Sequence, residues 1–172
     1  LSVFVFIFIF SFSNCMICCI FIYNYCSCFT VNNCIFISNT ALNDCGSSFY
    51  NSGSCFIVNN CSFINNTANN GAGAIYNSGS GLTVNNCSFI NNTANNGAGA
   101  IYNSGSGLTV NNCSFINNTA NNGAAIHYYS STSIIITSFI FNNITDNDGG
   151  TIHNSCYINN IIHLIFLQTV TK

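Results

Sequence analysis

Hydrophobic and polar residues alternate in short runs along the middle of this chain. The clearest runs are Leu82-Thr83-Val84, Cys87-Ser88-Phe89 and Ala100-Ile101-Tyr102. Such alternation is typical of short, half-buried β-strands. The residues between the runs are mainly Asn, Ser and Gly, which favour tight turns and left-handed backbone. Apolar residues at helical spacing are missing, so we predict three short strands per unit and an all-β fold.

The same pattern recurs in tandem. Residues 61–86 and residues 87–112 have an identical 26-residue sequence, and a third copy begins at Cys113. An earlier, divergent copy begins at Cys34, 27 residues before the first identical one. A further divergent copy starts at Ser138, where SFIFNNITDNDGGTIHN matches SFINNTANNGAGAIYN. Self-similarity of this period is the signature of a repeat architecture.

A strict 26-residue repeat favours a solenoid with one coil per repeat over a stack of hairpins. Equivalent residues of successive coils would then lie about 4.8 Å apart, in columns. Stacked Asn side chains would form amide ladders, and the stacked cysteines would be free, buried thiols. The residues expected in columns are Phe63, Phe89 and Phe115; Cys61, Cys87 and Cys113; Leu82 and Leu108; and Asn66, Asn92 and Asn118.

Two motifs in each unit resemble those of a known family. Phe-x-x-Asn occurs in SFINN (residues 63–66, 89–92 and 115–118), and Gly-Ala-Ile occurs in GAGAIYN. Together they resemble the FxxN and GGA[ILV] repeats of the chlamydial polymorphic membrane proteins and the Asn/Thr-rich adhesin-like surface proteins of methanogenic archaea, although GAGA replaces GGA. The resemblance covers about residues 31–154. It implies a right-handed parallel β-helix of pectate-lyase-like shape in a cell-surface or secreted protein with an adhesive or structural role.

The two ends differ from the repeats, which we place in residues 24–160. Residues 1–23 are apolar apart from Ser2, Ser11, Ser13 and Asn14. They fit a signal-peptide remnant, a transmembrane span or degenerate β-helix coils. Residues 161–172 are predicted to form a terminal strand that covers the end of the solenoid. Because the chain opens on Leu1 and not on Met, we expect it to be a fragment of a longer protein.

Charge is nearly absent, since the charged side chains are Asp44, Asp146, Asp148 and Lys172. Identical charges stacked in columns would repel at every coil, so a repeat of this kind favours the 33 Asn found here. The lack of basic residues excludes nucleic-acid binding. Glycoside hydrolysis needs two positioned carboxylates, and lyase chemistry needs basic residues.

We therefore expect a non-catalytic structural or adhesive segment without a cofactor. Its partner would be a carbohydrate or protein on a host or neighbouring cell. Membrane association would occur only through the N-terminal segment or missing domains. The alternative is a fragment of a β-helical carbohydrate-processing enzyme whose active site lies outside this chain.

Three groups of residues have the chemistry, but not the full pattern, of a metal site. They are Cys15, Cys18, Cys26 and Cys28; His153 and Cys156; and Asp146 and Asp148. We interpret the first as apolar cysteines, the second as a turn or surface histidine and the third as an Asp-rich turn. The other two histidines are His127 and His163. Asn-x-Ser/Thr sequons, which could carry glycans, occur at Asn60, Asn65, Asn86, Asn91, Asn112, Asn117 and Asn143.

Overall fold

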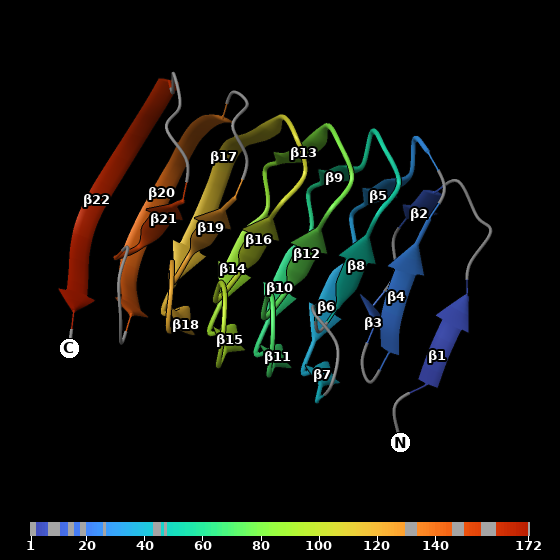
Figure 1. Ribbon diagram of the computed structural model, residues 1–172, viewed down its shortest axis with the longest axis horizontal. Coiled ribbons are helices and arrows are strands. Elements are labelled where there is room, and N and C mark those ends of the chain that lie inside the picture. The colour runs from blue at the N-terminus through green and yellow to red at the C-terminus, as the bar shows by residue number, and fades with distance from the viewer. Residues whose placement is uncertain are drawn as a thin grey trace.

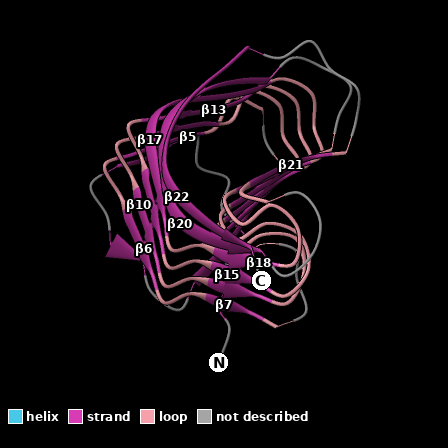
Figure 2. Ribbon diagram, turned by 90° about the vertical axis from the view of Figure 1, so that its left-hand side faces the viewer, coloured by secondary structure: helices cyan, strands magenta, loops and turns pink. Residues whose placement is uncertain are grey.

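The computed structural model describes residues 3–6, 11–13, 16–17, 20–25, 27–42, 46, 48–129, 134–145, 150–155 and 161–171. All of the regular structure in these residues is β-strand, and the strands form two parallel sheets (Figure 1). Viewed along the stack, the coils superpose and the smaller sheet faces the curved larger one (Figure 2). The structure therefore confirms an all-β parallel solenoid.

The smaller sheet has seven strands, which are β1 (Val3–Phe6), β4 (Ile20–Asn24), β8 (Phe49–Asn51), β12 (Ile75–Asn77), β16 (Ile101–Asn103), β19 (Ile126–Tyr128) and β21 (Ile152–Asn154). The larger sheet has fifteen, which are β2 (Ser11–Ser13), β3 (Met16–Ile17), β5 (Thr30–Asn32), β6 (Ile35–Ile37), β7 (Thr40–Ala41), β9 (Ile57–Asn59), β10 (Ser62–Ile64), β11 (Thr67–Ala68), β13 (Leu82–Asn85), β14 (Ser88–Ile90), β15 (Thr93–Ala94), β17 (Leu108–Ile116), β18 (Thr119–Ala120), β20 (Ile134–Thr145) and β22 (Ile161–Thr171).

One repeat makes one coil. From β12 the chain passes through β13, β14 and β15 of the larger sheet and returns to β16, which pairs with β12 in register. The coil length varies little, since hydrogen-bonded asparagines of neighbouring coils are separated by 27, 26 or 25 residues. The prediction of three strands per unit was incomplete, because β15 is a fourth. It contains only Thr93 and Ala94, which is too short to show an alternating pattern.

The core is built from columns of inward-facing side chains. Phe36, Phe63, Phe89 and Phe115 are fully buried, with ring centroids 4.7, 4.9 and 4.8 Å apart and ring planes within 6° of parallel. Leu82 pairs with Leu108 one coil away, and both are buried. Each coil thus covers the apolar surface of its neighbours with the same side chains.

The ends of the chain extend the same sheets. Near the start, β1 pairs in parallel with β4, and β4 pairs with β8. Near the end, β22 pairs in parallel with β20. Among the described residues, no helix has the length and apolarity needed to cross a membrane.

The divergent copy at Ser138 is shifted by one residue from the sequence alignment. The motif match places Ser138 opposite Ser114, but the structure pairs it with Cys113. The shift lets the Ser138 hydroxyl accept the Cys113 backbone N–H (3.3 Å) and places Asn143 beside Asn118 (2.9 Å). The register of this coil therefore follows the hydrogen bonds of Ser138 and Asn143 and not the alignment of its Ser-Phe-Ile sequence with that of the previous coil.

Candidate functional site

The asparagine of the Phe-x-x-Asn motif belongs to a buried amide ladder. Asn92 Nδ2 donates to Asn118 Oδ1 and to the Phe63 carbonyl oxygen, both at 3.0 Å. Asn92 Oδ1 accepts the Asn66 backbone N–H at 3.1 Å and Asn66 Nδ2 at 2.9 Å. The full column is Asn39, Asn66, Asn92, Asn118 and Asn143, all buried. In each motif the Phe ring thus packs in the core, and the Asn side-chain amide donates to the carbonyl oxygen of the equivalent Phe one coil earlier.

A second buried amide ladder runs beside the smaller sheet. Asn51 Nδ2 donates to Asn77 Oδ1 and Asn77 Nδ2 to Asn103 Oδ1, both at 2.6 Å. Each of these amides also donates to a glycine carbonyl two residues ahead, as Asn77 does to Gly79 (2.6 Å). This ladder was missed in the sequence, although the recurring Ile-Tyr-Asn was a usable signal. It ends at Tyr128, which is buried and occupies the next position of the column.

Cysteines form a third column, with Cys34, Cys61, Cys87 and Cys113 free and buried. The Cys87 thiol donates to the Asn85 carbonyl oxygen (3.2 Å) and accepts the Cys61 backbone N–H (3.4 Å). A hydrogen bond with Cys113 raises the pKa of the Cys87 thiol to about 12. The same kind of contact raises the pKa of the Cys61 thiol, whereas the hydrogen bond with Cys87 lowers that of the Cys113 thiol. Because the thiolate is the reactive form of cysteine, Cys61 and Cys87 are suited to packing and not to chemistry.

An aromatic column lies on the outer face of the smaller sheet. Tyr50, Tyr76 and Tyr102 are half-buried and stacked, with centroids 5.2 and 4.8 Å apart. His127 and His153 continue the column with edge-on contacts, at interplanar angles of 64° and 85°. His153, which the sequence led us to interpret as a turn or surface residue, lies in strand β21 and is half-buried. His127 is only 9% exposed, and its Nε2 contacts Ser155 Oγ at 3.0 Å. Stacking covers the tyrosine faces, so the column presents ring edges to solvent.

We predict that acid destabilises the solenoid through His127. Burial, and secondly His153, lower the pKa of His127 from 6.5 to about 4. Between pH 6.5 and about pH 4, His127 is therefore protonated in the unfolded chain and neutral in the folded chain. The stability contributed by neutral His127 is complete above pH 6.5 and is lost as pH falls toward 4, by about 2–3 kcal/mol.

Urea unfolding at neutral pH and near pH 4 measures this loss. The variant His127→Tyr removes the titrating ring and introduces the residue type that Tyr102 has at the equivalent position of the previous coil. It leaves the carboxyl groups of Asp44, Asp146 and Asp148 in place. An equal loss of stability in the variant and in the parent chain would show that His127 is not its source.

A shallow polar groove crosses three coils on the outside of the larger sheet. Its volume is about 380 Å³, and its lining repeats Asn-Cys-Ser at residues 60–62, 86–88 and 112–114. The asparagines are exposed and have positive φ of 53°, 53° and 50°, which bends the chain at each of them. Neighbouring hydroxyls and amides bond along the column, as Ser88 does to Ser62 (3.0 Å) and Asn112 to Asn86 (2.8 Å). The groove therefore offers uncharged donors and acceptors once per coil.

The structure separates the seven sequons into two kinds. Six of the sequon asparagines are exposed at left-handed corners, namely Asn60, Asn65, Asn86, Asn91, Asn112 and Asn117. The seventh, Asn143, is 1% exposed, and its amide donates to the Phe115 carbonyl oxygen (2.9 Å). Its side chain is committed to the buried ladder, so the folded chain presents only the other six.

Most metal candidates from the sequence lie outside the described residues. This applies to Cys15, Cys18, Cys26, Cys156, Asp146 and Asp148, and also to Asp44 and Lys172. The side chain of His163 is likewise not described. Within the described residues, no group of three or more His, Cys, Asp or Glu side chains could hold a metal ion.

Comparison with known families identifies the repeat. The model of the Chlamydia polymorphic membrane protein repeat matches residues 60–78, 86–104 and 112–128. Each match begins at a left-handed corner asparagine and extends to the next strand of the smaller sheet. No curated protein and no solved structure matches the chain, so the similarity to archaeal adhesin-like proteins stays a prediction. Three successive coils of the chain therefore match the Chlamydia polymorphic membrane protein repeat, as its two motifs indicated.

Proposed function

We propose that this chain is a non-catalytic, adhesive segment of a cell-surface or secreted repeat protein. The observation that carries the proposal is the groove that repeats Asn-Cys-Ser across three coils. Its exposed groups are neutral amides and hydroxyls, and its thiols are buried. Such a surface suits an extended, uncharged polymer lying along the stack, because each coil can offer the next unit of the polymer the same hydrogen bonds.

The repeat family that matches this chain supports the proposed location at the cell surface. The matching family model is that of a membrane protein of Chlamydia. A rigid stack of coils also suits a stalk, because its length grows with each repeat while its cross-section stays constant. A neutral surface polysaccharide on a host or neighbouring cell is the partner class that this groove fits.

We predict that the chain is retained on insoluble neutral polysaccharides such as chitin, cellulose or mannan and that the serines of the groove contribute. Replacing Ser62, Ser88 and Ser114 together with Val keeps the strand preference and removes one hydroxyl per coil. A lost hydrogen bond costs about 1 kcal/mol, so retention should fall at least roughly tenfold. Retention is measured by pull-down at increasing protein concentration.

The control is Thr83→Val with Thr109→Val, which removes half-buried hydroxyls of β13 and β17 outside the groove. Retention of this control should match that of the parent chain. The adhesive groove would be contradicted if the serine variant were retained as well as the parent chain, or if the parent chain were retained on none of the polysaccharides. Release of soluble sugars from the polysaccharide would instead favour the enzyme alternative.

A further inference from the structure

One corner of the solenoid carries cysteine in two coils and glycine in the next two. The backbone N–H of Cys28 donates to the Ser54 carbonyl oxygen (2.7 Å), and that of Cys55 donates to Ser80 (2.8 Å). Gly81 donates in the same way to Ser106 (2.7 Å). Cys28, Cys55, Gly81 and Gly107 have φ of 57°, 59°, 71° and 69°. They therefore occupy one equivalent left-handed position in successive coils.

This backbone conformation suits the glycines and disfavours the cysteines. A Cβ in the left-handed region lies too close to the following carbonyl oxygen, so residues other than Gly, Asn and Asp rarely adopt it. Gly81 and Gly107 avoid the strain, whereas Cys28 and Cys55 retain it. Strained positions that persist in a structure often have a functional reason.

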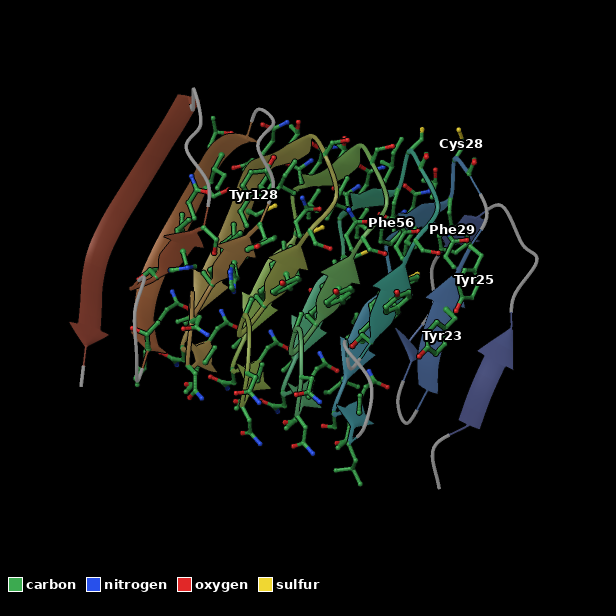
Figure 3. All side chains as sticks on the ribbon, viewed as in Figure 1. Tyr23, Tyr25, Cys28, Phe29, Phe56 and Tyr128 are labelled. Atoms are coloured by element: carbon green, nitrogen blue, oxygen red, sulfur yellow. The ribbon has the colours of Figure 1, made fainter. Side chains whose placement is uncertain are left out.

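The two cysteines also place their thiols together at the surface. Both are exposed, and a hydrogen bond with the Cys28 thiol raises the pKa of the Cys55 thiol. Figure 3 shows Cys28 at the outer rim of its coil, away from Phe29 and Phe56 in the core. Those two rings follow the cysteines in sequence and contact each other at 5.8 Å, which fixes the alignment of the two coils. The exposed thiols thus differ from the buried column of Cys61, Cys87 and Cys113.

We propose that Cys28 and Cys55 are an oxidation site that closes to a disulfide between neighbouring coils. Aligned residues one coil apart lie about 4.8 Å from each other, within the roughly 4.4–6.8 Å between Cα atoms that a disulfide spans. Both residues lie between strands, in the segments from β4 to β5 and from β8 to β9. These corners can therefore adjust the thiol directions without breaking a strand ladder.

A small-molecule disulfide such as oxidised glutathione is the oxidant. The Cys28 thiolate attacks one glutathione sulfur, forms a mixed disulfide and releases the first glutathione thiolate. Cys55 then loses its proton to solvent and attacks the Cys28 sulfur, which releases the second glutathione. The protein loses two electrons and two protons, and oxidised glutathione is reduced to two thiols.

The hydrogen bond within the pair favours this order of events. It raises the pKa of the Cys55 thiol, so Cys55 keeps its proton while Cys28 is a free thiol. The mixed disulfide on Cys28 removes that hydrogen bond and frees Cys55 to ionise and close the link. The disulfide joins positions 28 and 55, which are 27 residues apart in sequence. This link restricts the unfolded chain and raises the midpoint of thermal unfolding.

Peptide mapping of the full chain after incubation with oxidised glutathione tests the site. Alkylation followed by chymotrypsin, which cuts after Phe and Tyr, yields peptide 26–29 and peptide 51–56. We expect a linked species of these two peptides in the parent chain and in Cys26→Ser, a variant that removes the other cysteine of the first peptide. The buried cysteines at 61, 87 and 113 should be recovered in alkylated form.

Cys28→Gly is the matched negative variant, because glycine already occupies this position in later coils and the fold is retained. It should give no linked peptide, and oxidised glutathione should no longer raise its unfolding midpoint. Circular dichroism of the variant checks that the β-structure persists. Peptide 51–56 recovered only as a thiol or a glutathione adduct would overturn the proposal. A linked peptide that survives in Cys28→Gly would likewise overturn it, because Cys26 would then be the partner.

Discussion

Asn92→Ala is expected to destabilise the solenoid by about 3 kcal/mol or more. The change removes the acceptor of two donors on Asn66, its backbone N–H and its side-chain amide. It also removes the bonds from Asn92 Nδ2 to the Phe63 carbonyl oxygen and to Asn118. Because Asn66 is fully buried, water cannot replace the lost acceptor. Urea unfolding followed by circular dichroism measures the change in the free energy of unfolding.

The preceding residue provides the control. Asn91 is also an asparagine, but it is exposed and has a φ of 55°, and its side-chain amide donates to Asn65 Oδ1 at the surface (3.2 Å). Glycine adopts that backbone conformation freely, so Asn91→Gly should change the free energy of unfolding by no more than about 0.5 kcal/mol. Equal effects of the two variants would contradict the assignment of the buried ladder as a source of stability.

Phe89→Ala should have a comparable or larger effect, a loss of about 3–5 kcal/mol. The ring is fully buried between Phe63 and Phe115, so its removal leaves a cavity and breaks two stacked contacts at 4.9 and 4.8 Å. Since each coil is stabilised mainly by its neighbours, the cavity should also uncouple the coils on either side of it. Hydrogen exchange should then show faster opening of β10 and β17 than in the parent chain.

Ile90→Ala tests whether burial is the cause. Ile90 adjoins Phe89 in β14 but faces outward and is partly exposed. Removing its side chain should cost about 1 kcal/mol or less, because no enclosed cavity forms. A loss as large as that of Phe89→Ala would mean that the stacked rings have no special role in the core.

The sequence was sufficient to predict the solenoid and its main columns. Two identical 26-residue units can satisfy each other's apolar and polar groups only by stacking in register, and the structure stacks Phe89 on Phe115 and Leu82 on Leu108. The two motifs also predicted the repeat family whose model matches residues 60–78, 86–104 and 112–128. The fourth strand was missed because two residues are too few for periodicity, and the strand position of His153 was missed because its repeat had diverged from the Tyr102 pattern.

Only the tertiary structure decided what adjacent or repeated residues of one type do. Asn91 and Asn92 are chemically identical, but the left-handed turn at Asn91 leaves its side chain in solvent and directs that of Asn92 inward. Likewise Cys55 and Cys61 lie close together in the sequence, yet Cys55 is exposed and Cys61 is buried. Sequence periodicity determines which residues stack on one another. The direction of each corner determines whether a column faces the core or the solvent, and that direction is a property of the folded backbone.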